Sequence, residues 1–284
     1  MLGTAGDLLL LAAFVVCGLS AFSFFWSAQA TPGSALARTW KRVGRLTWGG
    51  MSAAVGAASG ILWYMLLTHQ YQYAYVYQQS SNDLPLHFLF STFWAGQEGS
   101  FLFWALVMCG VGGLLIAYVH RKYETPVMAV VALCQAFLLS MMVGVQFGPV
   151  EIGSSPFMTL PEKFTDAPIF QQNPGFVPAD GQGLNDLLQN PWMTIHPPVL
   201  FLGFSAMVVP FAFAVAALWK KRYTQWVRPA LPWTLFAVLS LGVAIAMGGS
   251  ERAASSPLPR TCSSSTPRSS RAAAFWETCR STRL

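Results

Sequence analysis

Long apolar blocks without charge dominate the chain and define its architecture. Six of them reach about the 20 residues that an α-helix needs to cross a hydrocarbon layer. They occupy residues 8–26, 46–67, 100–119, 125–145, 198–219 and 230–249, and none contains Asp, Glu, Lys or Arg. Because a bilayer core requires every backbone group to be hydrogen-bonded internally, this pattern predicts an all-α, polytopic transmembrane helix bundle. About six spans are expected, joined by outward-facing amphipathic and aromatic loops.

Composition excludes a water-soluble enzyme. The chain has 284 residues, of which 54% are hydrophobic, 14% aromatic and only 10% charged, whereas soluble domains carry roughly 25% charged residues. The five cysteines form no Cys-x-x-Cys pair and no metal-ligand spacing, so neither a disulfide framework nor a zinc site is indicated. They are Cys17, Cys109, Cys134, Cys262 and Cys279.

Basic residues alternate between the connections and predict an orientation. They follow the first, third and fifth spans, at Arg38, Lys41, Arg42, Arg45, Arg121, Lys122, Lys220, Lys221, Arg222 and Arg228. The loops after the second and fourth spans hold a single basic residue, Lys163, among seven acidic ones. The positive-inside bias therefore places the N-terminus and these large loops on the outer, periplasmic side of the membrane.

The chain divides into a transmembrane region, 1–250, and a tail of different composition, 251–284. Residues 1–250 hold 11 basic and 9 acidic residues, for a net charge of +2, whereas the tail holds six Arg, no Lys and two Glu, for +4. Most of the net charge of +6 thus lies in the tail and does not indicate a nucleic-acid partner. A tail read out of frame would have this bias, and a disordered tail that binds an anionic partner is the alternative.

The first outer loop, 69–99, is unusually aromatic. It contains four tyrosines at alternate positions, followed by an apolar run at 84–90 and the pair Phe93 and Trp94. Tyrosine and tryptophan favour the membrane surface, where an apolar ring and a polar edge are both satisfied. Two interpretations remain open: an interfacial anchor, and an apolar platform for a flat hydrophobic ligand.

Small and capping residues predict local helix geometry. Ser52, Gly56 and Gly60 recur every four residues and predict a close contact between the second span and another helix. Ser100 is expected to cap the third span, and Glu98 complements the dipole at the N-terminus of that helix. These features indicate packing and no chemistry.

The second outer loop ends in the most informative motif of the chain. Asn190 and Pro191 precede His196, which Pro197 and Pro198 follow directly. Proline is favoured in a first helical turn, so the two prolines are expected to start the fifth span and to hold His196 just above it. At that position the imidazole is either an interfacial hydrogen-bonding group or an axial ligand to haem iron.

Three segments carry a resemblance to a known family. They are YVYQQSSNDLP at 75–85, WAGQEGS at 94–100 and LNDLLQNPWMTIHPPVLFLG at 184–203. Over about residues 1–250 the chain resembles the CcmF-type haem lyases of bacterial cytochrome c maturation, which belong with CcmC-type and CcsA-type haem-handling proteins. The resemblance implies that His196 is one of two outward axial ligands to haem iron. It also implies that Trp192 and Trp94 give the haem apolar cover.

The resemblance further implies a function and a location. Haem would be received from a haem chaperone and attached to apocytochrome c, with thiol-reducing maturation subunits as further partners. The protein would lie in the lipid of the bacterial inner membrane. The chain departs from the family pattern because it lacks the Trp-rich WWD element and the second outward histidine. We therefore expect no haem attachment by this chain alone.

Two other functions compete with the haem lyase. A transporter of haem or another small molecule would need polar groups along its path, but the six predicted spans have no charged residue. A non-catalytic scaffold subunit of a maturation complex would bind its partners through the outer loops. Haem content after purification separates the lyase from the scaffold, and a flux assay in vesicles tests transport.

Overall fold

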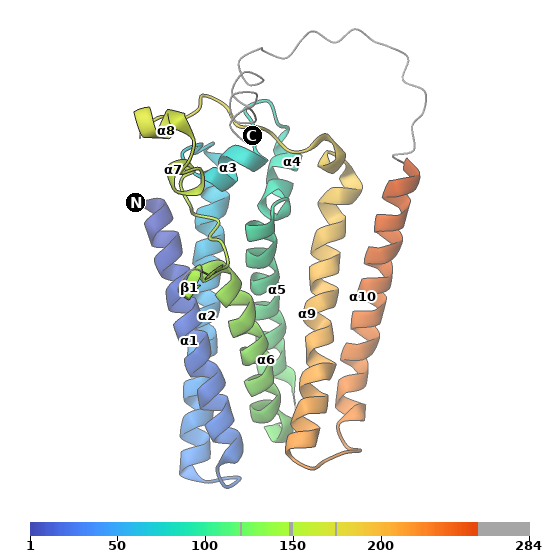
Figure 1. The fold of residues 1–284 in the computed structure, drawn as a ribbon. Coiled ribbons are helices and arrows are strands. Elements are labelled where there is room, and N and C mark those ends of the chain that lie inside the picture. The colour runs from blue at the N-terminus through green and yellow to red at the C-terminus, as the bar shows by residue number, and fades with distance from the viewer. Residues whose placement is uncertain (120, 148–149, 174, 255–284) are drawn as a thin grey trace.

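Six long helices run side by side in the computed structural model, which describes residues 1–119, 121–147, 150–173 and 175–254 (Figure 1). They are α1 (Leu2–Gln29), α2 (Ala35–Leu67), α5 (Gln97–Tyr118), α6 (Arg121–Val143), α9 (Pro191–Trp219) and α10 (Val227–Ala254). Each is long and apolar enough to span a membrane. The prediction of an all-α bundle with six spans is confirmed. The last helix continues to Ala254, and residues 255–284, most of the predicted tail, lie outside the described residues.

Helix caps extend the helices beyond their apolar blocks. The side chain of Ser34 accepts a hydrogen bond from Ala37 N at 3.1 Å, so α2 begins at Ala35. The four basic residues that the sequence analysis assigned to the first connection, at 38, 41, 42 and 45, therefore lie in the first turns of α2. The assignment was wrong because a polar helix end looks like a loop in a hydropathy pattern.

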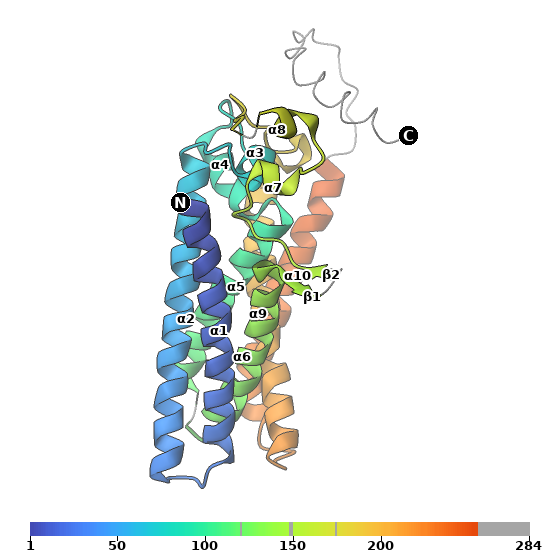
Figure 2. The ribbon, with the colours of Figure 1, turned by 60° about the vertical axis from the view of Figure 1, so that its left-hand side comes forward.

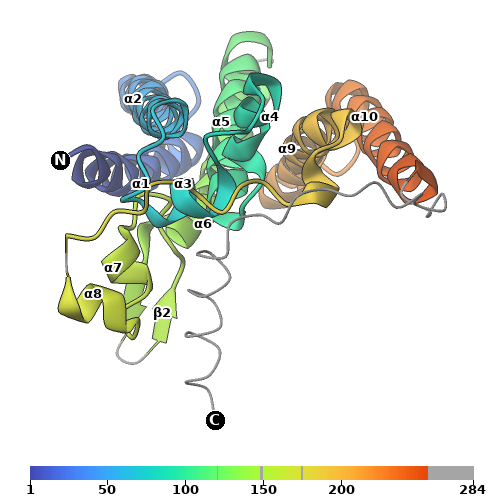
Figure 3. The same cartoon turned by 90° about the horizontal axis from the view of Figure 1, so that it is seen from above.

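The bundle is built around α6. This helix contacts α1, α5 and α9, while α1 also packs on α2, and α2 on α5. Viewed from above, α9 and α10 form a pair at one side of the other four long helices (Figure 3). In the most apolar stretch of α6, 61% of the residues are buried inside the structure. In that of α10, which lies at the edge, the share is 22%. The apolar residues of α10 that face outward suit a lipid environment.

The close helix contact lies elsewhere than predicted. Nothing lies within 4 Å of a Cβ placed at Gly56 or Gly60, so these two glycines of the small-residue ridge make no close contact with another helix in the described structure, whereas Ser52 lies beside Cys109 of α5. Instead, α2 turns Trp48, which is 2% exposed, towards Gly112 of α5. The indole Nε1 donates to the Cys109 carbonyl at 3.4 Å. The Trp48 ring packs this closely on α5 because Gly112 has no side chain.

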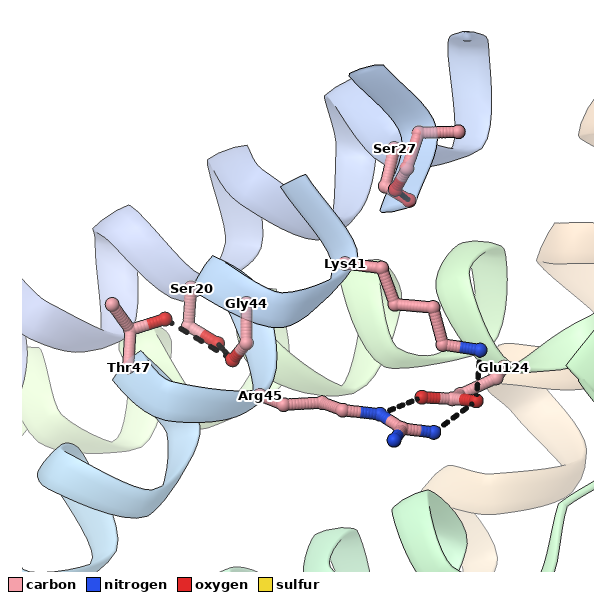
Figure 4. A network of polar contacts seen from close by, with 8 residues as sticks. Ser20, Ser27, Lys41, Gly44, Arg45, Thr47 and Glu124 are labelled. Atoms are coloured by element: carbon pink, nitrogen blue, oxygen red, sulfur yellow. Dashed lines mark hydrogen bonds and ion pairs between the residues drawn. The ribbon is translucent and has the colours of Figure 1, made fainter. Parts of the chain in front are cut away.

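An ion cluster joins α2 to α6 near the end of the bundle that carries the basic residues (Figure 4). The Glu124 carboxylate, only 1% exposed, accepts hydrogen bonds from Arg45 Nε at 2.6 Å and Arg45 Nη2 at 2.8 Å. Lys41 forms a second ion pair with the same carboxylate. Charge-assisted, bidentate pairing compensates the burial of this carboxylate.

Short elements cover the opposite end of the bundle, where the N-terminus lies (Figures 1 and 2). They are α3 (Ala74–Gln79), α4 (Leu86–Ser91), η1 (Thr92–Trp94), α7 (Leu160–Lys163), α8 (Pro168–Gln172) and η2 (Asp186–Leu188). Strands β1 (Val145–Phe147) and β2 (Val150–Ile152) form a small antiparallel hairpin after α6. We call the six short helices the outer cap.

Candidate functional site

The tyrosines of the first outer loop form the interior of the outer cap. Tyr71, Tyr73 and Tyr75 are only 5%, 5% and 2% exposed. The Tyr75 hydroxyl lies 2.9 Å from the Thr92 carbonyl and 2.8 Å from the Phe93 carbonyl, to either of which it can donate. Burial raises the pKa of Tyr75 well above its usual value, so its hydroxyl remains protonated. The interpretation of these tyrosines as a membrane-surface anchor is therefore wrong, because protein surrounds them.

The two outer loops are hydrogen-bonded into one layer. Asn82 N donates to Asp180 Oδ1 at 2.9 Å, and the Tyr71 hydroxyl donates to Asn82 Oδ1 at 3.0 Å. Burial, with a smaller contribution from Asp180, raises the pKa of Tyr71 to about 12 and keeps this donor protonated. Gly181 of the second loop approaches the first loop so closely that an added Cβ would lie 2.0 Å from the Ser80 carbonyl oxygen. The second loop, which leads to His196, is thus supported by the first.

The N-terminus of α5 is anchored to the outer cap, and the residue at its N-cap position differs from the prediction. Gly96 occupies the N-cap position, so Ser100 lies inside the helix, where its hydroxyl donates to the Trp94 carbonyl at 2.9 Å. The prediction of Ser100 as N-cap was wrong because the glycine turn lets the helix start earlier. Glu98 lies in the first turn as expected and pairs with Lys163 of α7 at 2.8 Å.

The predicted ligand His196 lies inside α9. The Asn190 side chain accepts from Trp192 N at 3.0 Å and Pro191 takes the first helical position, so the helix begins ahead of the histidine. The expectation that Pro197 starts this span was therefore wrong, since it lies within the helix. An Asn cap followed by proline is the stronger start signal, and it was visible in the sequence.

The His196 ring faces α10. Its Nδ1 lies 2.9 Å from the Ala244 carbonyl oxygen, and the side chain is half-buried. A Cβ placed at Gly248, one turn further along α10, would lie 3.3 Å from the ring Cε1 and 3.7 Å from Nε2. No hydrogen bond to Nε2 is recorded within the described part of the chain. Among the described residues, one ring nitrogen is therefore engaged by the protein and the other has no hydrogen-bond partner.

The two candidate tryptophans lie in different surroundings. Trp192 precedes His196 by four residues, which puts both on one face of α9, and it is 48% exposed. Trp94 instead lines a cavity of about 100 Å³ that Pro197 borders. Its indole Nε1 is buried and has no hydrogen-bond partner within the described residues. Ligand pockets enclose roughly 300–1,000 Å³, so this cavity alone does not enclose a cofactor.

The other described histidines of the outer side are not built as metal ligands. The Nδ1 of His69 lies 3.0 Å from the Tyr71 hydroxyl. His87 is exposed on α4, with its ring 4.2 Å from that of Phe88. Among the described residues, no three His, Cys, Asp or Glu side chains come close enough to hold a metal ion. The structure thus offers single imidazoles and no complete metal centre in this part of the chain.

A groove between α5 and α9 was not predicted from the sequence. It has a volume of about 390 Å³ and is lined by Trp104, Phe204, Met207, Val208 and Phe211. The aromatic residues of α9 recur at helical spacing, which is the signal that could have revealed it. Because its walls belong to membrane-spanning helices and are apolar, lipid chains suit it.

The chain is similar to known proteins of cytochrome c assembly. The profile of the family described as Cytochrome C assembly protein matches residues 94–259. The cytochrome c-type biogenesis protein CcmF of Pseudomonas fluorescens is 34% identical over 212 residues, which cover 74% of this chain and 29% of that protein. The cytochrome c-type biogenesis protein ccl1 of Rhodobacter capsulatus is 32% identical over 224 residues, covering 78% and 29%. The chain therefore spans under a third of the length of these curated relatives.

A solved structure is also similar. The structure titled Cytochrome c Heme Lyase CcmF matches with a TM-score of 0.65 and 27% sequence identity. The match covers 86% of this chain and 35% of that one. The sequence-based resemblance is confirmed, and with it the arrangement of the described helices.

Proposed function

The chain belongs to the cytochrome c assembly protein family, and on this premise we propose that it holds haem through His196 during bacterial cytochrome c maturation. The observation that carries the proposal is the ring geometry of His196. Its Nδ1 is hydrogen-bonded to a backbone carbonyl while its Nε2 is available, which is the arrangement of a ligating imidazole. No other described histidine of the outer side combines a carbonyl-bound nitrogen with this motif.

The donor set fits haem better than a bare metal ion. A single neutral imidazole would hold a haem iron, because the porphyrin itself supplies four of the other ligands of that iron. When bound, haem supplies that iron and the vinyl groups that form thioether bonds with cysteine thiols. Trp192, on the same helical face as His196 and half-exposed, would give apolar cover to a ring placed there. Trp94 would contribute from the neighbouring cavity beside Pro197.

The three cysteines of the described residues do not serve as acceptors for haem. Cys17 and Cys109 are buried in the helix bundle and Cys134 is half-buried within α6, away from the outer cap. The thiols would come from an apocytochrome c, kept reduced by thiol-reducing maturation subunits, and the haem from a haem chaperone. The role of this chain is to bind and orient, which lowers the entropic cost of bringing porphyrin and thiol together.

The charge distribution supports an inner-membrane location with the outer cap outside. Helix ends and a connection rich in Lys and Arg lie at one end of the bundle, and the cap with its acidic residues lies at the other (Figure 1). The positive-inside bias places the basic end in the cytoplasm. His196, in the second turn of α9 on the cap side, would then meet haem outside the membrane.

A haem titration tests the proposal. The purified chain in detergent is titrated with ferric haem and the shift of the Soret band is followed. We expect His196→Ala to weaken binding at least tenfold, because the axial nitrogen is lost. His87→Ala, an exposed histidine of the cap, is the control and should bind as the wild type does. Equal affinity of the wild type and His196→Ala would refute the assignment.

A scaffold function is the second candidate, because the two outer loops are hydrogen-bonded into one layer that offers a surface to maturation subunits. A scaffold binds maturation subunits through the outer cap and needs no His196. Co-purification with those subunits that persists in His196→Ala, together with absence of haem binding, would support it. Transport has less support, since the Asp, Glu, Lys and Arg residues of the long helices lie near their ends.

A further inference from the structure

The crossing of α9 and α10 fixes the surroundings of His196. Two turns below it, Gly203 of α9 lies so close to α10 that an added Cβ would be 2.7 Å from Leu241 Cδ2 and 3.1 Å from the Leu241 backbone nitrogen. On α10, Ala244 is fully buried, and Gly248 follows it by one turn. Because the two backbones approach this closely, the His196 ring reaches a main-chain carbonyl of α10 directly.

We propose that the Ala244 carbonyl and Gly248 act together as a positioning seat for His196, selecting Nε2 as its ligating nitrogen and keeping the space beside that nitrogen open. This inference rests on the proposed function, since it specifies how α10 prepares the same histidine for haem. It assigns to α10 a role that the sequence motif around His196 does not contain. Gly248 is a positioning residue, acting through the imidazole.

Hydrogen-bond chemistry selects the tautomer. A carbonyl oxygen only accepts, so at 2.9 Å the Nδ1 of His196 must carry the hydrogen. A neutral imidazole has one ring hydrogen, so Nε2 keeps its lone pair. Partners that hold the second nitrogen of a metal-ligating histidine typically change metal affinity by about 10-fold to 100-fold when removed. Here the partner is a backbone group, which no side-chain substitution deletes.

The absent side chain at position 248 supplies the second part of the seat. The Cβ that glycine lacks would be nearer to Cε1, at 3.3 Å, and to Nε2, at 3.7 Å, than to Nδ1, at 3.8 Å. A methyl group there requires a shift of a few tenths of an ångström. The branched side chain of leucine extends past Cβ and would crowd the ring edge that carries Cε1 and Nε2. Larger side chains at 248 should therefore restrict access to this edge of the ring.

Gly242 of the same helix offers a matched control. Nothing lies within 4 Å of a Cβ placed there, and the residue is exposed. Gly242→Leu therefore adds the same side chain to α10 without meeting His196. Both substitutions replace glycine in a helix by a better helix former, so their effects on helix propensity cancel in the comparison.

Two measurements test the seat independently of haem. In the full chain with ¹⁵N-labelled histidine, NMR should show His196 as the Nδ1–H tautomer, with the resonance identified by its loss in His196→Ala. Diethyl pyrocarbonate should modify His196 of the wild type and of Gly242→Leu at equal rates, and His196 of Gly248→Leu at least tenfold more slowly. An Nε2–H tautomer, or equal modification rates in all three proteins, would overturn the inference.

A third measurement links the seat to the proposed function. With ferric haem as the probe, Gly248→Leu should weaken binding at least tenfold and Gly248→Ala less, while Gly242→Leu binds like the wild type. If His196→Ala binds haem as the wild type does, the proposed function fails, yet the tautomer and modification data still decide on the seat. If His196→Ala loses binding but Gly248→Leu keeps it, the seat is refuted and the proposed function stands.

Discussion

The contact between Trp48 and Gly112 makes a sharp test of how the bundle packs. In Gly112→Ala, the new Cβ would lie 2.0 Å from Trp48 Cζ2, whereas ordinary contacts begin near 3.4 Å. The indole must therefore retreat by about 1.4 Å. Trp48 is 2% exposed and donates to the Cys109 carbonyl at 3.4 Å, so it has little free space and a hydrogen bond to lose.

The magnitude follows from three contributions. Overpacking of a filled core costs about 1–3 kcal/mol, and a lost hydrogen bond about 1 kcal/mol. Replacing glycine by alanine in a helix returns about 0.5–1 kcal/mol. Gly112→Ala should thus be destabilised by about 1–3 kcal/mol. The neighbouring Gly113 is exposed with nothing within 4 Å of an added Cβ, so Gly113→Ala should be neutral or stabilised.

The assay compares the two alanine variants with the wild type. The free energy of unfolding is measured in mixed detergent micelles by titration with sodium dodecyl sulfate, following tryptophan fluorescence. The variants should differ by at least about 1 kcal/mol, roughly fivefold in the ratio of folded to unfolded protein. Equal stability of Gly112→Ala and Gly113→Ala would refute the packing of α2 on α5 at this point.

Three further predictions concern the ion cluster, the outer cap and the orientation. Arg45→Gln should cost about 1.5 kcal/mol of unfolding free energy in the same titration, because a buried carboxylate loses a bidentate partner, whereas exposed Arg42→Gln should change stability by less than about 0.5 kcal/mol; equal effects would refute the cluster. The Tyr75 hydroxyl also accepts a hydrogen bond from Gly96 N, the N-cap residue of α5, at 3.2 Å, so Tyr75→Phe should speed amide hydrogen exchange there; unchanged exchange would contradict this contact. In a cysteine-free background, Asp83→Cys should react with an impermeant thiol reagent in intact cells and Lys221→Cys only after permeabilisation; the reverse result would invert the orientation.

Sequence alone determined the features that depend on local chemistry. Uncharged blocks of about 20 residues must be helical in a bilayer whatever their neighbours are, so the six spans followed directly from the pattern. The motif around His196 likewise carried the family resemblance, which the comparisons confirmed. Starts of helices were less certain: Asn190 with Pro191 and Gly96 with Gln97 were readable as start signals, but Pro197 and Ser100 competed with them.

Only the tertiary structure decided which faces meet. The tyrosines at 71, 73 and 75 have the composition of a membrane-surface belt, and they are buried because α7 and the loop that follows it fold over them. Gly56 and Gly112 look alike in the sequence, yet only Gly112 receives a tryptophan. His196 obtains its Nδ1 partner from Ala244, 48 residues further along the chain. Hydropathy records how much of a segment is apolar, whereas hydrogen bonds and close contacts between helices depend on rotation and depth, which residues distant in the sequence fix together.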